Sequence, residues 1–174
     1  RLTYPLSFNN ADYSFSKWRK RARTILLDCI KPAPPKASSY NMTVVDSQKR
    51  NGYKVEKIEF NLSQYSRAAA YLLVPNGEGP FPAVLLLHDH GAKFIIGKEK
   101  MVRPFNVDNT TLSEADTWVE KCYDNQYVAD YLASNGYVVL VLDALFWGER
   151  GRKEGVRYDS QQALAANMLQ MGMS

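Results

Sequence analysis

The sequence predicts an α/β fold in which antiparallel strands lead into a parallel sheet. Two short runs, 83–87 and 138–142, are apolar at every position, which is typical of parallel strands that are covered on both faces. A helical pattern lies between them, so residues 83–142 predict a βαβ unit. Before residue 76 the chain instead alternates apolar and polar side chains, as antiparallel strands at the edge of a sheet do.

The first expected element is an amphipathic helix that begins near Phe15. Apolar side chains recur there at three- and four-residue spacing, and Pro32 ends the pattern. Residues 31–36 contain three prolines and predict a stiff linker. We therefore expect residues 1–36 to form an N-terminal helix with a Pro-rich linker.

Three strands are expected next, over residues 42–46, 54–62 and 67–74. Asn51-Gly52 separates the first two and is a strong signal for a hairpin turn. Between the two apolar runs, one helix is expected from a Ser113 cap to Leu132. A last helix begins near Asp159 or Ser160, runs through Met171, and has no stop signal before the chain ends.

The composition excludes several classes of function. Twenty-two Lys and Arg against 18 Asp and Glu give a net charge of +4, a moderate excess that does not by itself indicate a nucleic-acid partner. No apolar run approaches the roughly 20 residues that cross a bilayer, so no membrane span is expected. Cys29 and Cys122 are far apart and are expected to be buried free thiols.

His88-Asp89-His90-Gly91 follows the first apolar strand and contains both histidines of the chain. Sites in open α/β sheets form beyond the carboxyl ends of the strands. Three roles are open for this segment. The histidines bind a metal, with Asp143 as a further ligand; the loop donates a backbone N–H to an oxyanion; or His88 only bonds neighbouring backbone.

A second candidate segment follows the other apolar strand, from Asp143 to Arg152. Asp143 either holds its turn together, pairing with Arg150 or Arg152, or takes part in catalysis. Phe146 and Trp147 either form a pocket wall or pack inside the protein.

These segments resemble bacterial α/β-hydrolase esterases of the acetyl xylan esterase and dienelactone-hydrolase-like group. The resemblance covers residues 12–174 and is carried by three strings, which are Ala83–Gly91, Lys98–Lys100 and Asp143–Arg150. It implies that residues 37–174 are the N-terminal part of an α/β-hydrolase domain, incomplete at its C-terminus. It also implies that the His90 backbone N–H, or less firmly that of Asp89, is an oxyanion donor. The usual loop of that group has Gly directly after the first His, where this chain has Asp89. Gly91 is expected to let the backbone of this loop turn tightly.

The resemblance further implies a serine carboxyl-ester hydrolase, acting on a small-molecule or carbohydrate ester without a cofactor, in the periplasm or secreted. The Ser, acid and His of such an enzyme are expected in the remainder of the same polypeptide. The only Gly-x-Ser is Gly172-Met173-Ser174, and we expect Ser174 to lie within a helix rather than at a nucleophile elbow. Two alternatives stay open: a metal-dependent hydrolase that uses His88 and His90, and a non-catalytic binding module.

Overall fold

A computed structural model describes residues 4–10, 13–151 and 158–172. The chain divides into two compact units, residues 1–35 with 159–174 and residues 36–158. All residues of the two predicted site segments that the structure describes lie in the second unit. Arg152 and Ser174 lie outside the described residues.

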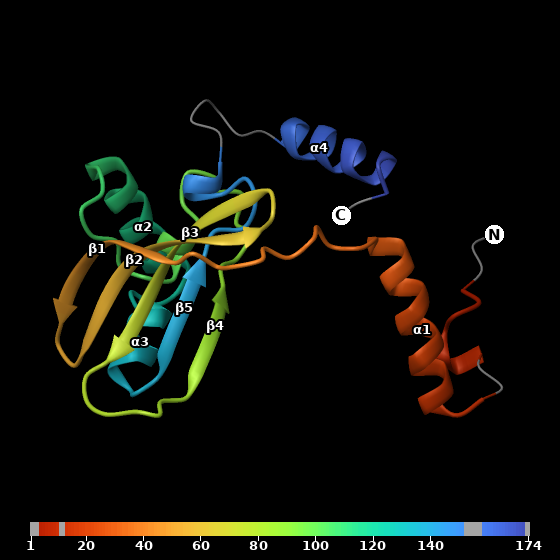
Figure 1. The fold of residues 1–174 in the computed structure, drawn as a ribbon, viewed down its shortest axis with the longest axis horizontal. Coiled ribbons are helices and arrows are strands. Elements are labelled where there is room, and N and C mark those ends of the chain that lie inside the picture. The colour runs from red at the N-terminus through yellow and green to blue at the C-terminus, as the bar shows by residue number, and fades with distance from the viewer. Residues whose placement is uncertain (1–3, 11–12, 152–157, 173–174) are drawn as a thin grey trace. The chain divides into compact units, whose positions relative to one another are not determined.

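The second unit contains a five-stranded sheet in the order β1-β2-β3-β5-β4 (Figure 1). Its strands are β1 Thr43–Arg50, β2 Tyr53–Ser63, β3 Ser66–Pro75, β4 Ala83–Leu87 and β5 Val138–Leu142. The first three strands and β5 pair antiparallel, and β4 pairs parallel with β5. The predicted α/β class is therefore confirmed, and both apolar runs form strands with the predicted bounds.

The β1–β2 hairpin turns at Asn51-Gly52, as predicted. Arg50 is paired with Tyr53, and Gly52 has φ +86°, a conformation that costs glycine little because it has no Cβ. β1 continues to Arg50 rather than ending at Asp46, because the ladder with β2 extends up to the turn.

The crossover between β4 and β5 contains two helices rather than the single helix that was predicted from Ser113 to Leu132. Helix α2, Asn109–Cys122, is capped by Asp108, whose side chain accepts from the Thr111 N–H. Helix α3, Val128–Ser134, follows after a turn. Residues Asp124 and Asn125 in that turn have positive φ, so the chain cannot continue as one right-handed helix.

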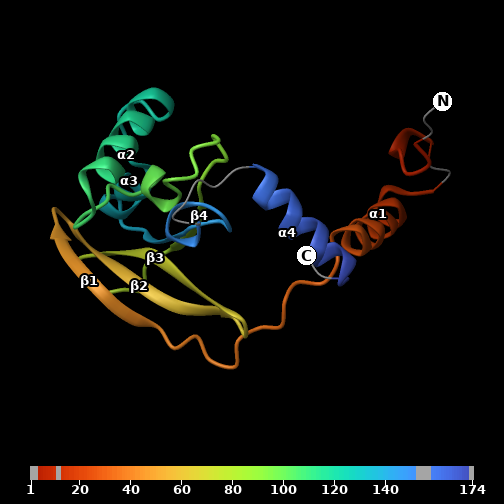
Figure 2. The same cartoon turned by 90° about the horizontal axis from the view of Figure 1, so that it is seen from above.

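The core lies between one face of the sheet and the crossover. Figure 2 shows α2 and α3 on the same side of the sheet. Side chains of β2, β3 and β5 meet side chains of α3 and of the segment after β4 there. The buried members are Tyr53, Val55, Tyr71, Leu73, Met101, Val102, Phe105, Ala129, Ala133, Val139 and Val141.

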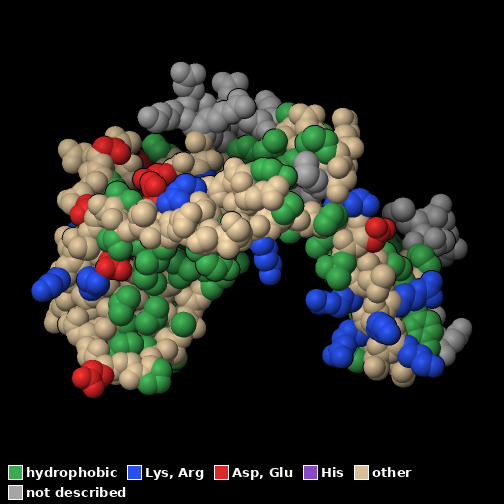
Figure 3. All heavy atoms as spheres, in the orientation of Figure 1, with side chains coloured by type: hydrophobic (Ala, Val, Ile, Leu, Met, Phe, Trp, Pro, Cys, Tyr) green, Lys and Arg blue, Asp and Glu red, His purple; other side chains and the backbone are tan. Residues whose placement is uncertain are grey.

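The prediction that strand 83–87 is covered on both faces is wrong for the face of the sheet opposite the core. β4 is the edge strand of the described sheet, and Leu85 and Leu87 are 61% and 71% exposed. Figure 3 shows hydrophobic side chains gathered over β3, β5 and β4. Among the described residues of the second unit, no helix covers the Leu85 and Leu87 side chains as α2 and α3 cover the other face.

The first unit holds helix α1, Phe15–Ile30, a short 3₁₀ helix, η1 Phe8–Asn10, and all but the first residue of helix α4, Tyr158–Gln170. The start of α1 is fixed by Trp18, whose indole Nε1 donates to Leu6 O at 2.7 Å. α4 begins near the predicted residue and ends at Gln170. Two residues later, Gly172 has φ +71°, a conformation that a right-handed helix does not allow. The prediction that the helix runs through Met171 is therefore wrong.

Two further expectations concern the cysteines and the membrane. Cys29 and Cys122 are both exposed, so the prediction of buried thiols is wrong. Cys29 lies on a helix with no buried residue, and Cys122 is the last residue of α2. Among the described residues, no helix is long and apolar enough to cross a membrane.

We expect Leu73→Ala to lower the free energy of unfolding by about 2–5 kcal/mol, because the substitution leaves a cavity in the core. Leu73 is fully buried on β3. The matched control is Leu62→Ala on β2, where the side chain is 38% exposed and the expected loss is below about 1 kcal/mol. Urea unfolding of both variants checks this; equal losses would contradict the described core.

Candidate functional site at the ends of β4 and β5

The loops that follow β4 and β5 are held together by His88. The neighbouring parallel strands end at Leu87 and Leu142, so both loops leave the same edge of the sheet. The Ala144 N–H donates to His88 Nε2 at 2.9 Å. Nδ1 therefore carries the proton and donates to Asp89 O at 2.8 Å. Both ring nitrogens of His88 are thus engaged by backbone groups.

The Asp89 side chain points toward α2. Its Oδ2 accepts from Tyr123 Oη at 2.6 Å and from Trp118 Nε1 at 3.1 Å. Partial burial raises the pKa of this carboxyl, but the two hydrogen bonds and the nearby Lys100 ammonium outweigh burial, and the net pKa is lowered. Asp89 thereby anchors the loop to the crossover helix.

Gly91 and His90 complete this loop. Gly91 has φ +49°, and a Cβ there would lie 2.3 Å from Cζ2 of Trp118, so glycine is required by conformation and by space. The His90 ring packs edge-on against Trp147, with 5.0 Å between ring centroids, and its Nδ1 accepts from the Ala92 N–H at 3.2 Å.

Lys100 is a fully buried lysine beneath the same loop. Its Nζ lies 3.0 Å from Asp89 O and 3.1 Å from His90 O, and the Trp118 ring centroid is 5.1 Å away. Burial lowers the pKa of the Lys100 ammonium, and the charge of Asp89 opposes that effect.

Asp143 is fully buried directly after β5. Its Oδ1 accepts from the Lys98 N–H at 2.7 Å, and its Oδ2 accepts from Lys98 Nζ at 2.8 Å and from the Glu149 N–H at 3.1 Å. Two glycines leave room for this carboxylate: a Cβ would lie 2.3 Å from Oδ1 at Gly97 and 2.7 Å from Oδ2 at Gly148. Burial raises the pKa of the Asp143 carboxyl, and Lys98 opposes that effect.

The Lys98 ammonium is surrounded by three carboxylates. Asp143 Oδ2 and Glu99 Oε1 are each 2.8 Å from Nζ, and Glu149 Oε2 is 2.7 Å away. Burial alone would lower the pKa of Lys98, but the three carboxylates raise it above its usual range. Burial raises the pKa of Glu149, yet Lys98 lowers it more, so its net pKa is lowered.

The other predicted residues of the second loop support its backbone. Arg150 Nη1 donates to Asp143 O at 3.0 Å. Trp147 is 8% exposed, and its Nε1 donates to His90 O at 3.1 Å. It therefore packs beneath the first loop instead of presenting its ring to solvent. Phe146 is half-buried with φ +78°, and the turn residues 148–150 form a 3₁₀ helix, η3.

The structure brings the two predicted segments together, and it adds residues that the sequence reasoning did not assign to the site. Lys98, Glu99 and Lys100 form the short helix η2, with all three side chains buried. A sequence signal existed: this charged triplet lies between the apolar pairs Ile95-Ile96 and Met101-Val102. Glu149 already belonged to the predicted second segment. Trp118 and Tyr123 gave no comparable signal, because their partner, Asp89, is distant in the chain.

A hollow of about 960 Å³ adjoins the ion cluster. Three segments line it, 92–95, 106–108 with Thr111, and 148–149 with Gly151, and Lys57 and Glu99 complete its wall. Its size is within the range of small-molecule sites. The Glu99 and Glu149 side chains connect it to the buried Lys98.

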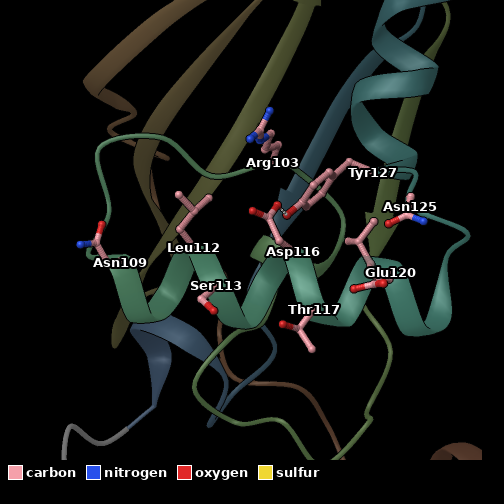
Figure 4. Close-up of a pocket in the computed structure, with 10 residues that line it drawn as sticks. Arg103, Asn109, Leu112, Ser113, Asp116, Thr117, Glu120, Asn125 and Tyr127 are labelled. Atoms are coloured by element: carbon pink, nitrogen blue, oxygen red, sulfur yellow. Dashed lines mark hydrogen bonds between the residues drawn. The ribbon is translucent and has the colours of Figure 1, made fainter.

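A second hollow, of about 540 Å³, runs along α2. Figure 4 shows Asp116 and Tyr127 pointing toward one another there, and Tyr127 Oη donates to Asp116 Oδ1 at 2.8 Å. No residue of the two predicted segments lines this hollow, whereas Gly148, Glu149 and Gly151 of the second segment line the first one. We therefore place the candidate site at the β4 and β5 loops.

The described residues offer no metal site: no group of three His, Cys, Asp or Glu among them is arranged to hold an ion. The His88 nitrogens are already bound to Asp89 O and the Ala144 N–H. A metal at His88 would have to break one of these bonds. What the arrangement offers instead is a loop whose Asp89 and His90 carbonyls accept from the buried Lys100 ammonium.

A mixed sheet with a βαβ unit, and with polar loops at the carboxyl ends of its parallel strands, is typical of open α/β folds, among them the α/β-hydrolases. A family model, the Abhydrolase family, matches residues 1–174, and the chain belongs to that family. The predicted resemblance is confirmed at this level.

Individual relatives were also found. The Bacillus subtilis protein YtaP, named as a candidate hydrolase, is 31% identical over 100 residues, which are 57% of this chain and 28% of YtaP. A Bacteroides fragilis crystal structure, named as a candidate acetyl xylan esterase, is 20% identical with a TM-score of 0.63, covering 94% of this chain and 40% of its own.

A glucuronoyl esterase from Solibacter usitatus is 12% identical, with a TM-score of 0.48, over 95% of this chain and 53% of its own. The chain therefore spans between about a quarter and a half of the length of these three relatives.

Lys98→Met is expected to lower the free energy of unfolding by about 3–5 kcal/mol, because it leaves buried carboxylates without their cation. The control is Lys54→Met, since Lys54 forms a surface ion pair with Glu56, where a loss of about 0–1 kcal/mol is expected. Chemical denaturation measures both. A Lys98 variant as stable as the control would contradict the described cluster.

The lowered pKa of Asp89 predicts a pH dependence of stability. The Asp89 carboxylate contributes to the free energy of unfolding at pH values above its pKa in the unfolded chain, about 3.9. This contribution is lost as the pH falls through the lower pKa of the folded protein. Asp89→Asn should therefore reduce stability at pH 7 and flatten its fall toward pH 2. Asp124→Asn, at an exposed turn residue, should keep the wild-type profile. Urea unfolding across this pH range decides between a flattened and an unchanged curve.

Proposed function

We propose that this chain is the N-terminal part of a serine carboxyl-ester hydrolase that cleaves acetylated or otherwise esterified carbohydrate. The observation that carries the proposal is the His88–Gly91 loop. It lies at the carboxyl end of β4 and is fixed by His88, Asp89 and the buried Lys100. α/β-Hydrolases place an oxyanion donor in the loop after a strand of this kind.

In the proposed reaction the serine Oγ bonds to the ester carbonyl carbon and its proton passes to the histidine base. The carbonyl oxygen becomes an oxyanion, which accepts from the His90 N–H and from a second donor. The intermediate then expels the sugar alcohol, which takes the proton from the histidine. Water hydrolyses the acyl-enzyme and releases the carboxylic acid.

The serine, acid and histidine of this reaction are assigned to the rest of the polypeptide. Gly172-Met173-Ser174 does not fit a nucleophile elbow, because an elbow follows a strand and the element before it is the helix α4. His88 does not fit the base, because both its ring nitrogens bond backbone groups. We therefore assign the histidine base to the rest of the polypeptide.

The substrate class and the location come from the sequence resemblance. An acetylated or otherwise esterified carbohydrate agrees with the name of the Bacteroides fragilis protein, whose likeness to this chain supports the fold. A periplasmic or secreted location stays a prediction. The metal-dependent alternative is less well supported, because His88 has no nitrogen left to bind an ion.

We expect a fluorophosphonate probe to label the full-length polypeptide at one serine beyond residue 174, and p-nitrophenyl acetate to be hydrolysed by the unlabelled protein. Peptide mass mapping locates the labelled serine. Treatment with a strong chelator is the control and should leave hydrolysis unchanged. Activity that is lost on chelation and insensitive to the probe would favour a metal-dependent hydrolase, and no activity at all would favour a binding module.

A further inference from the structure

Lys100 bonds to two consecutive peptide groups of the candidate oxyanion loop. Its Nζ lies within 3.1 Å of both Asp89 O and His90 O. These oxygens belong to peptide groups 89–90 and 90–91, whose N–H groups are those of His90 and Gly91. We propose that Lys100 is a positioning residue that turns these two N–H groups toward the substrate carbonyl; this inference rests on the proposed function.

Each of the two carbonyls has a second donor. His88 Nδ1 donates to Asp89 O at 2.8 Å, and Trp147 Nε1 donates to His90 O at 3.1 Å. Four hydrogen bonds therefore fix two adjacent peptide planes. Because C=O and N–H point in opposite directions across a trans peptide, carbonyls that converge on Lys100 direct both N–H groups away from it. Successive N–H groups arranged in this way form a concave site for an anionic oxygen.

A buried ammonium suits this role better than a neutral donor. Charge-assisted hydrogen bonds are shorter and stronger than neutral ones, and one Nζ has enough protons for both carbonyls. The surroundings compensate its charge: Asp89 Oδ1 is 3.5 Å away and the Trp118 ring faces the ammonium. The Lys100 side chain is fully buried, so it acts on the substrate only through the loop backbone.

The test is Lys100→Met in the full-length polypeptide, with p-nitrophenyl acetate as substrate and phenylboronic acid as a tetrahedral analogue. We expect kcat to fall about 10- to 100-fold, KM to change less than about threefold, and the inhibition constant of the boronic acid to rise in parallel with the loss in kcat. The basis is the loss of about 10²–10³ in kcat that follows removal of an oxyanion donor. Lys49→Met, at an exposed residue of β1, is the matched control and should match the wild type.

Trp147→Phe is the second variant. It removes one of the four hydrogen bonds while retaining an aromatic ring, and kcat should fall about 3- to 10-fold. Circular dichroism and thermal unfolding check that each variant folds. If Lys100→Met does not fold, the kcat of Trp147→Phe tests whether the hydrogen bonds to these two carbonyls matter for the reaction. Hydrogen exchange of a peptide covering residues 88–92 should be faster in both variants.

The outcomes separate the two proposals. A wild-type protein that is folded but neither hydrolyses the ester nor reacts with the fluorophosphonate overturns the proposed function. An active wild type whose folded Lys100→Met and Trp147→Phe variants keep kcat and boronic-acid affinity overturns the role of Lys100. A fall in stability with unchanged kcat would likewise show that Lys100 only supports the fold.

Discussion

The site depends most on the ion pairs that the buried Lys98 ammonium forms with Asp143, Glu99 and Glu149. Three carboxyl groups surround one cation, and such a cluster is costly to bury unless its remaining oxygens are bonded. The backbone N–H groups of Lys98 and Glu149 meet this need at Asp143. Glu149 is about half exposed, which lets water share its charge. The cluster therefore joins η2 to the loop after β5, 45 residues further along the chain.

η2 links both loops because its two lysines serve different partners. Lys98 bonds to Asp143 after β5, and Lys100 bonds to the carbonyls of Asp89 and His90 after β4. Three consecutive residues thus contact both of the loops that follow the paired strands β4 and β5. His88 adds a direct link through Ala144. Sites held by such supporting contacts keep their geometry without rearrangement during reaction, which a preorganised oxyanion donor requires.

The sequence was sufficient for the strands and insufficient for the buried charges. Apolar runs and the Asn51-Gly52 turn predicted the sheet because periodicity and turn chemistry are local. The expected burial of 83–87 on both faces failed at Leu85 and Leu87, since burial depends on what packs against a strand. The Ser113 cap failed because Asp108 lies five residues earlier and offers an equally good side chain. Lys98 and Lys100 escaped prediction because lysine is almost always exposed unless paired, and their partners are set by the fold.

Asp89 shows how the fold accommodates a departure from the expected loop. The sequence resemblance implies a glycine directly after the first histidine, where this chain has Asp89. Here the Asp89 carboxylate is directed to Trp118 and Tyr123, while its carbonyl accepts from His88 and Lys100. One residue is thus fixed through both its side chain and its backbone. The residue of this loop that lies closest to the Trp118 ring is Gly91, where a Cβ would collide with the indole. The position that has to be glycine is therefore Gly91, two residues after Asp89, and the peptide group that joins Asp89 to His90 is bonded through the Asp89 carbonyl.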